Sequence, residues 1–159
     1  MMIILKPTIK IRKRFSKIDF ETLSLVYSLL FDSVYKAKKK RNYTLYIKFV
    51  KKDYSYYTFQ PGKYVYIKMS GVIFDDKQFH STLLHEFRHF IQDKVFRIPL
   101  TKNNYDETTL NSYLTSPVEA DAEWFEMHST PKVIKLYNKL FKLKTSLAKD
   151  CKYIGNKIK

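Results

Sequence analysis

Residues 85–89 have the pattern H-E-x-x-H, which is typical of zinc sites. On a helix, His85 and His89 lie one turn apart on the same face, so both imidazoles can bind one metal ion. Glu86 lies about 100° further round the helix and can reach a metal-bound water without being a ligand itself. The apolar residues of this segment fall on the opposite side and predict a buried face: Leu83, Leu84, Phe87 and Ile91. The pattern therefore predicts a metal site on a helix whose other face packs in the core.

A catalytic zinc site needs a third protein ligand and an open position for water. A histidine six residues after His89 is excluded, because that position is Val95. A ligand four residues after His89 would be Asp93, which departs from the pattern H-E-x-x-H-x-x-x-H. The remaining option is a glutamate on a following helix, which Glu119 supplies. Cys151 is the only cysteine in the sequence, so a site built from cysteines is excluded.

Glu119 also has a second interpretation, as part of a helix cap. Ser116 and Glu119 have the spacing of a capping box, and Pro117 suits the first helical position. We favour the ligand role, because a capping glutamate does not require the upstream H-E-x-x-H. Glu123, one turn further, is either an alternative ligand or a partner that orients a ligating histidine. Asp121 points elsewhere on the helix and is expected to be a surface or capping carboxylate.

Three further polar side chains are candidates for stabilising an oxyanion. His128 lies near the end of the helix that carries Glu119, and Tyr105 and Tyr113 lie in the loop between the two motif helices. His80 falls off the ligand face of its helix and is expected on the surface.

H-E-x-x-H and the downstream glutamate together resemble the motifs of gluzincin-type metallopeptidases, especially the minigluzincin-like single-domain forms and the ImmA/IrrE-like proteins. The resemblance covers roughly residues 71–126. It implies a zincin-like fold and one zinc ion per chain, held by His85, His89 and Glu119. Glu86 would then be the general base. The implied activity is hydrolysis of peptide bonds in a protein or peptide substrate by a metal-activated water.

The residues around these motifs predict an α+β domain, with an antiparallel or mixed sheet and helices packed on one face. The expected strands are 2–12, 43–51, 55–60, 63–69 and 72–74, with the middle three forming an antiparallel meander. The expected helices are 19–39, 77–96, one that begins at 116, and 131–149. In the families that the chain resembles, the substrate lies along an edge strand, a role that residues 72–74 or 64–66 would take here.

The length of 159 residues predicts one domain. Its expected parts are 1–76 with most of the sheet and one long helix, 77–149 with the motif helices, and a basic tail at 150–159. The apolar start of the chain is broken by Lys6 and Pro7 and is too short for a signal peptide or a membrane span. We therefore expect an intracellular, cytoplasmic protein.

The sequence has 30 basic and 15 acidic residues, a formal net charge of +15. Such an excess attracts polyanions, including nucleic acid. An alternative function is therefore a basic nucleic-acid-associated or regulatory binding protein whose metal site is structural or vestigial. The features that favour it are the basic run 36–41, tyrosines able to stack on bases and a lysine-rich C-terminal segment: Tyr54, Tyr56, Tyr57, Lys132, Lys135, Lys139, Lys142 and Lys144.

Overall fold

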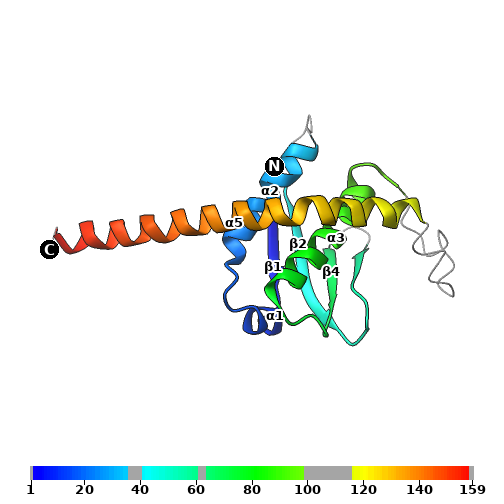
Figure 1. Ribbon diagram of the computed structural model, residues 1–159, viewed down its shortest axis with the longest axis horizontal. Helices are drawn as coiled ribbons and strands as arrows, with labels where there is room; N and C mark the ends of the chain where they lie inside the picture. The colour runs from blue at the N-terminus through cyan, green and yellow to red at the C-terminus, as the bar shows by residue number, and fades with distance from the viewer. Residues whose placement is uncertain (1, 36–40, 61–63, 99–115, 158–159) are drawn as a thin grey trace.

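Figure 1 shows the computed structural model of the chain, which describes residues 2–35, 41–60, 64–98 and 116–157. Its elements in chain order are β1 (Ile3–Pro7), α1 (Ile9–Arg14), α2 (Phe20–Val34), β2 (Tyr43–Val50), β3 (Tyr56–Gln60), β4 (Tyr64–Ser70), α3 (Asp76–Lys94) and α5 (Pro117–Lys157). The four strands form one sheet in the order β1-β2-β4-β3. The α+β class predicted from the sequence is confirmed.

The sheet is mixed, and the antiparallel meander expected from the three middle strands is wrong. β2 pairs in parallel with both β1 and β4, whereas β3 and β4 are antiparallel. The chain leaves β2, forms the edge strand β3 and returns as β4 between the two. The sequence predicts where the strands are but not their order in the sheet. A meander and the observed order bury the same alternate side chains, such as Ile47 and Ile67.

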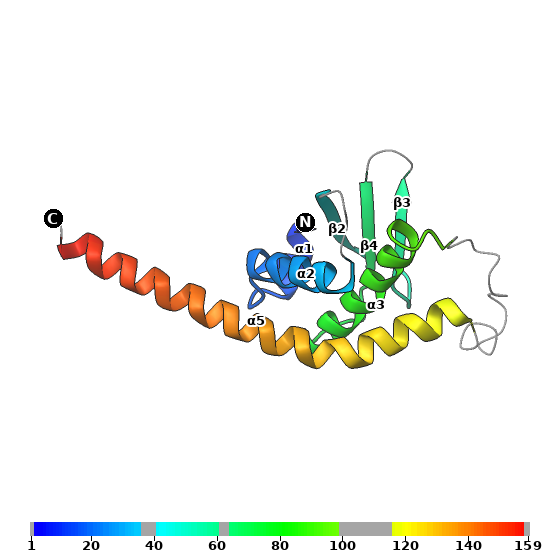
Figure 2. The same ribbon diagram turned by 90° about the horizontal axis from the view of Figure 1, so that it is seen from above.

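The described helices lie on one face of the sheet, as predicted (Figure 2). α1, α2 and α3 pack directly on the strands, and α5 crosses α2 and α3 without touching the sheet. The core between these layers is rich in aromatic rings, including Tyr27, Phe79, Phe87 and Phe90. Full burial of a side chain such as Phe87 is worth roughly 1.5–3 kcal/mol. This packing therefore fixes the rotation of α3, and with it the direction of the opposite helix face.

The first two predicted elements differ from those in the structure. The expected strand 2–12 is divided into β1 and α1: the Thr8 amide donates the last pairing hydrogen bond, to the Ile47 carbonyl, and α1 begins at Ile9. The helix expected at 19–39 begins as predicted, with the Asp19 side chain accepting from the Thr22 amide, but it ends at Val34. Residue 35 already has extended backbone, and the lysine run at 36–40 lies outside the described residues.

The strand expected at 72–74 is a turn, so this prediction is wrong. Both Val72 and Phe74 are exposed, and the segment is held by a side chain instead of a neighbouring strand. The guanidinium group of Arg14 donates to the carbonyls of Gly71 and Ile73 and lies over the Phe74 ring. α3 then begins at Asp76, and the Asp75 side chain accepts a hydrogen bond from the Gln78 amide, as a helix cap does.

α5 is one helix of 41 residues, where the sequence predicted two helices and a tail. Pro131 lies inside it and removes one backbone hydrogen bond to the carbonyl four residues earlier. The carbonyl four residues earlier belongs to Met127, which is exposed, so water can donate a hydrogen bond to it in place of the missing amide. Residues 150–157, expected as a tail, continue the helix. Among the described helices, including this long one, none is apolar enough over sufficient length to cross a membrane.

His80 on α3 is buried against α5, so the surface position expected from the sequence is wrong. Its exposed fraction is 5%, and its Nδ1 has no hydrogen-bond partner among the described residues. The His80 ring lies 5.7 Å from that of Tyr137 on α5. Burial lowers the pKa of His80, and the charge of Asp76 opposes this effect only in part.

We expect replacement of His80 by Leu to flatten the pH dependence of stability. In the unfolded chain the imidazole binds a proton near pH 6.5, whereas in the folded protein it does so only at lower pH. The parent therefore loses up to about 1.4 kcal/mol of stability per pH unit as the pH falls below about 6.5. Urea unfolding of both metal-free proteins at pH 7.5 and pH 5.0 measures this. A stability difference between them that does not change with pH contradicts the assignment.

Candidate metal centre

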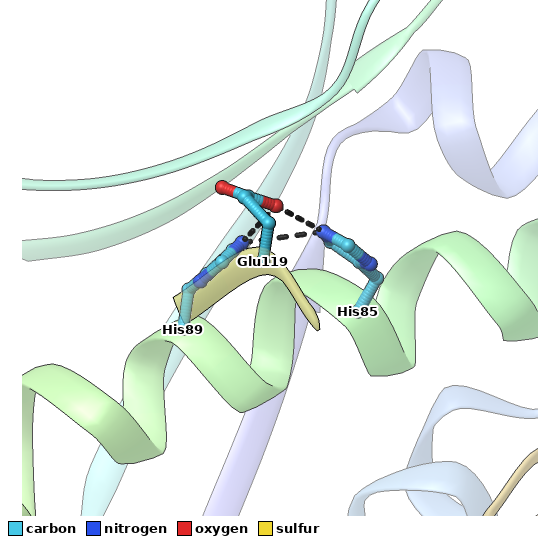
Figure 3. Close-up of side chains that lie close together, drawn as sticks. All are labelled: His85, His89 and Glu119. Carbon is cyan, nitrogen blue, oxygen red and sulfur yellow. Dashed lines mark hydrogen bonds and ion pairs between the residues drawn. The ribbon is translucent and has the colours of Figure 1, made fainter. Parts of the chain in front are cut away.

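His85 and His89 on α3 meet Glu119 from the first turn of α5 (Figure 3). One carboxylate oxygen of Glu119, Oε2, lies 3.1 Å from His85 Nε2 and 3.3 Å from His89 Nε2. The two Nε2 atoms are 3.2 Å apart. Glu119 and His89 are buried, and the His85 side chain is only 13% exposed. Three metal-ligating atoms therefore converge on one point between the two helices.

The spacing of these three atoms fits a zinc ion. Zinc binds imidazole nitrogen and carboxylate oxygen at about 2.0–2.2 Å, and tetrahedral geometry then separates neighbouring ligand atoms by roughly 3.3 Å. The separations in the cluster are 3.1, 3.2 and 3.3 Å. Within the described residues, this is the one group of three or more His, Cys, Asp or Glu side chains that could hold a metal ion.

A carboxylate on α5 orients His85. The Nδ1 of His85 lies 3.1 Å from Glu126 Oε2, and the other oxygen of Glu126 accepts from the Ser81 hydroxyl. A carboxylate at this position accepts a hydrogen bond from the Nδ1–H group, so the Nε2 lone pair faces the cluster. Glu126 is seven residues after Glu119, two turns along the same face of α5.

An amide orients His89 in a corresponding way. The Nδ1 of His89 lies 2.8 Å from Gln92 Oε1, which accepts a hydrogen bond from the Nδ1–H group, so Nε2 can serve as the metal ligand. The amide nitrogen of Gln92 donates to the Val118 carbonyl and to Asp121, which fixes which end of the amide faces the histidine. Asp121 in turn accepts two hydrogen bonds from Arg88, so it is part of the contact between α3 and α5 and not a surface or capping carboxylate.

The electrostatics of the cluster favour a cation. Burial by itself lowers the pKa of His85, but hydrogen bonds to Glu119 and Glu126 outweigh it and raise the pKa to about 10. For His89 too, burial lowers the pKa, and the hydrogen bond to Glu119 raises it more. Positive charge is therefore stabilised at this position, and a divalent ion can replace the proton that the histidines would otherwise hold.

Glu86 is buried beside the cluster without belonging to it. Its side chain is 4% exposed, and its Oε2 has no hydrogen-bond partner among the described residues. Burial raises the pKa of Glu86 to about 7, although the charges of His89 and His85 oppose this. A carboxylate with a pKa near neutrality can both take up and release a proton at physiological pH.

Among the described residues, the contacts of Glu119 and Ser116 favour the ligand role of Glu119 over the capping box. The carboxylate of Glu119 contacts the two histidines, and the hydroxyl of Ser116 is buried with no hydrogen-bond partner in the part of the chain that the structure describes. Asp93, which would be the ligand in the alternative spacing, accepts a hydrogen bond from the Tyr57 hydroxyl instead.

The structure does not bring the other candidate residues to this cluster. Glu123 is exposed on α5, and the role of histidine partner falls to Glu126. His128 is nine residues after Glu119, on the opposite side of the helix, where its Nδ1 contacts the Trp124 carbonyl. Tyr105 and Tyr113 lie outside the described residues.

Sequence reasoning missed Glu126 and Gln92, the two partners of the histidines. The spacing in the sequence could have indicated both residues, because each lies seven residues after a proposed ligand: Glu126 after Glu119, and Gln92 after His85. Seven residues are two turns of a helix, so each of these side chains projects in nearly the same direction as the ligand before it.

No known protein family, curated protein or solved structure matches this chain. The resemblance to gluzincin-type metallopeptidases therefore depends on two short sequence motifs, H-E-x-x-H and the downstream glutamate at position 119.

Replacing Glu126 with Gln is expected to weaken zinc binding about tenfold to hundredfold, because the variant loses the charge that makes His85 a stronger ligand. Competition with a chromophoric zinc chelator measures the affinity. The matched control is Glu123→Gln, which makes the same change at an exposed position three residues away and should leave the affinity unaltered. Equal affinities for the two variants would remove Glu126 from the site.

Proposed function

We propose that the protein is a zinc metallopeptidase of the gluzincin type, with His85, His89 and Glu119 as zinc ligands. The observation that carries this proposal is the convergence of three ligand atoms within 3.3 Å of one another, beside a buried glutamate. A purely structural zinc site is usually closed by four protein ligands. The described residues bring together three ligands here, which is the number of protein ligands in catalytic zinc sites.

The chain's own residues supply the proton transfers of such a reaction. A zinc ion bound at this position would act as a Lewis acid toward water and the substrate carbonyl. Glu86 takes a proton from the attacking water, because burial keeps its pKa near 7 and no hydrogen bond holds its Oε2 among the described residues. Glu86 then gives the proton to the leaving amine, and Glu126 and Gln92 keep the histidines oriented throughout.

The strand that would bind an extended substrate is β3. The two strands considered from the sequence do not qualify, because 72–74 is a turn and 64–66 belongs to β4, which lies inside the sheet. β3 is one of the two edge strands of the sheet, and it is the one that packs against α3. The backbone amide of Tyr57 on β3 hydrogen-bonds to Glu86, which places this edge next to the proposed base. A peptide can pair with such an edge as an added strand.

The test of this function is hydrolysis of a proteome-derived peptide library, read by mass spectrometry. The zinc-loaded protein should produce cleavages that stop when a chelator removes the metal and resume when zinc is restored. A zinc-loaded protein that leaves the library intact, or cleavages that continue in the chelator at the same rate, would contradict the proposal.

A further inference from the structure

The face of the sheet opposite the helices carries a regular array of tyrosine and lysine side chains. Side chains alternate between the two faces of a strand, so burial of Leu45, Ile47 and Ile67 under the helices turns their neighbours to the other side. We call this the tyrosine–lysine face, and all its members are at least partly exposed: Lys6, Tyr46, Lys48, Tyr56, Tyr66 and Lys68.

The register of the strands places half of this face in one row across the sheet. Lys6 on β1 lies opposite Tyr46 on β2, which lies opposite Tyr66 on β4. The ring centroids of Tyr46 and Tyr66 are 5.6 Å apart. Two aromatic rings therefore lie side by side near the middle of a partly exposed sheet surface.

The other half forms a second row one pleat further along the strands. Lys48 on β2 lies opposite Lys68 on β4, which lies opposite Tyr56 on β3. The Nζ of Lys48 is 4.7 Å from the centroid of the Tyr66 ring, and that of Lys68 is 4.8 Å from the Tyr56 ring. Each of these two ammonium groups thus lies close to a tyrosine ring on a neighbouring strand.

The charge of this face is not balanced within the sheet. Like charges directly opposite each other on neighbouring strands, such as Lys48 and Lys68, destabilise a sheet. The contacts of the lysines with the tyrosine rings offset only part of this repulsion, because an exposed cation–π contact is weak. Of the described strand residues on this face, none is acidic. An anionic partner would relieve the repulsion.

We propose that the tyrosine–lysine face binds single-stranded nucleic acid, with phosphates at the lysines and bases stacked on Tyr46 and Tyr66. Proteins that bind single strands combine a positive surface with aromatic rings that stack on bases. A duplex keeps its base faces covered, and an anionic membrane or acidic peptide would use the charge without the rings. The metal cluster lies on α3 and α5, on the other side of the sheet, so the two sites are separate and this proposal does not depend on the peptidase activity.

Fluorescence anisotropy tests this with the full chain and three labelled probes at low salt: a 20-nucleotide oligo(dT), a 20-nucleotide oligo(U) and a DNA duplex of equal length. Single-strand binding should be tighter than duplex binding and should weaken steeply with salt. The double variant Lys48→Glu, Lys68→Glu should weaken it at least about tenfold. The matched control, Lys139→Glu with Lys142→Glu on exposed positions of α5, changes the net charge equally and should change the affinity by less than about twofold.

The stacking role is tested separately by Tyr46→Leu and Tyr66→Leu, each expected to weaken binding about fivefold or more. A far-ultraviolet circular dichroism spectrum and a urea unfolding midpoint like those of the parent show that each variant is folded. Comparing oligo(dT) with oligo(U) distinguishes DNA from RNA as the natural ligand, and tighter binding of either one supports the proposal. It is overturned if no single strand binds, if the duplex binds as tightly as the single strands, or if the α5 control loses as much affinity as the sheet variant. Capture by vesicles rich in anionic lipid without binding of any oligonucleotide would also overturn it.

Discussion

Replacing Glu86 with Gln is expected to reduce peptide hydrolysis by a factor of about 10²–10⁴ while leaving one zinc ion per chain. The amide has nearly the shape of the carboxylate, but it cannot accept a proton from water. Glu86 is not among the three metal-ligating side chains, so zinc binding should be retained. Because the change removes proton transfer and leaves the edge of β3 in place, it should lower kcat more than it raises KM.

The measurement compares parent and Glu86→Gln protein on the same peptide library, followed by kinetics on the best-cleaved peptide. Glu123→Gln is the matched control, because it makes the same chemical change at an exposed position and should retain parental activity. Glu86→Gln protein that cleaves at the parental rate would show that another group is the base. Loss of zinc from this variant would show that Glu86 is a ligand.

Replacing Glu119 with Gln is expected to weaken zinc binding by a hundredfold or more. The Oε2 atom of Glu119 is the one that lies within 3.3 Å of both histidine nitrogens, and a neutral amide is a much poorer ligand for zinc. The histidines also depend on this carboxylate, because their hydrogen bonds to it raise the pKa of both. His85→Ala and His89→Ala should have effects at least as large.

Isothermal titration with zinc measures these losses, and the control is again Glu123→Gln. The alternative assignment, in which Glu123 is the ligand, predicts the opposite ranking of the two variants. Parental affinity in Glu119→Gln together with loss in Glu123→Gln would move the site one turn along α5.

The candidate site was largely predictable, because helical spacing fixes directions within one element. H-E-x-x-H on a helix was enough to place His85 and His89 together and Glu86 beside them. The buried face of α3 was predictable for the same reason, and Leu83, Leu84, Phe87 and Ile91 are all fully buried. The role of Glu119 was harder to predict from the sequence. Both the capping box and the ligand role place it in the first turn of a helix, and only the contact with the histidines of α3 distinguishes them.

What could not be predicted depends on contacts between elements distant in sequence. Nothing local shows that β4 returns between β2 and β3, and this exchange makes β3 the edge strand next to Glu86. The turn at 72–74 depends on Arg14, nearly 60 residues earlier. By helical spacing, either Glu123 or Glu126 could project on the same side of α5 as Glu119. Only the way α5 crosses α3 brings Glu126, and not Glu123, to His85.

The most direct test of the central claim is elemental analysis of the purified protein after loading with zinc and removal of the excess. The arrangement of His85, His89 and Glu119 predicts about one zinc per chain in the parent and in Glu86→Gln, and none in His89→Ala. Parent protein that retains no zinc, or folded His89→Ala protein that retains as much as the parent, would contradict a metal centre at this position.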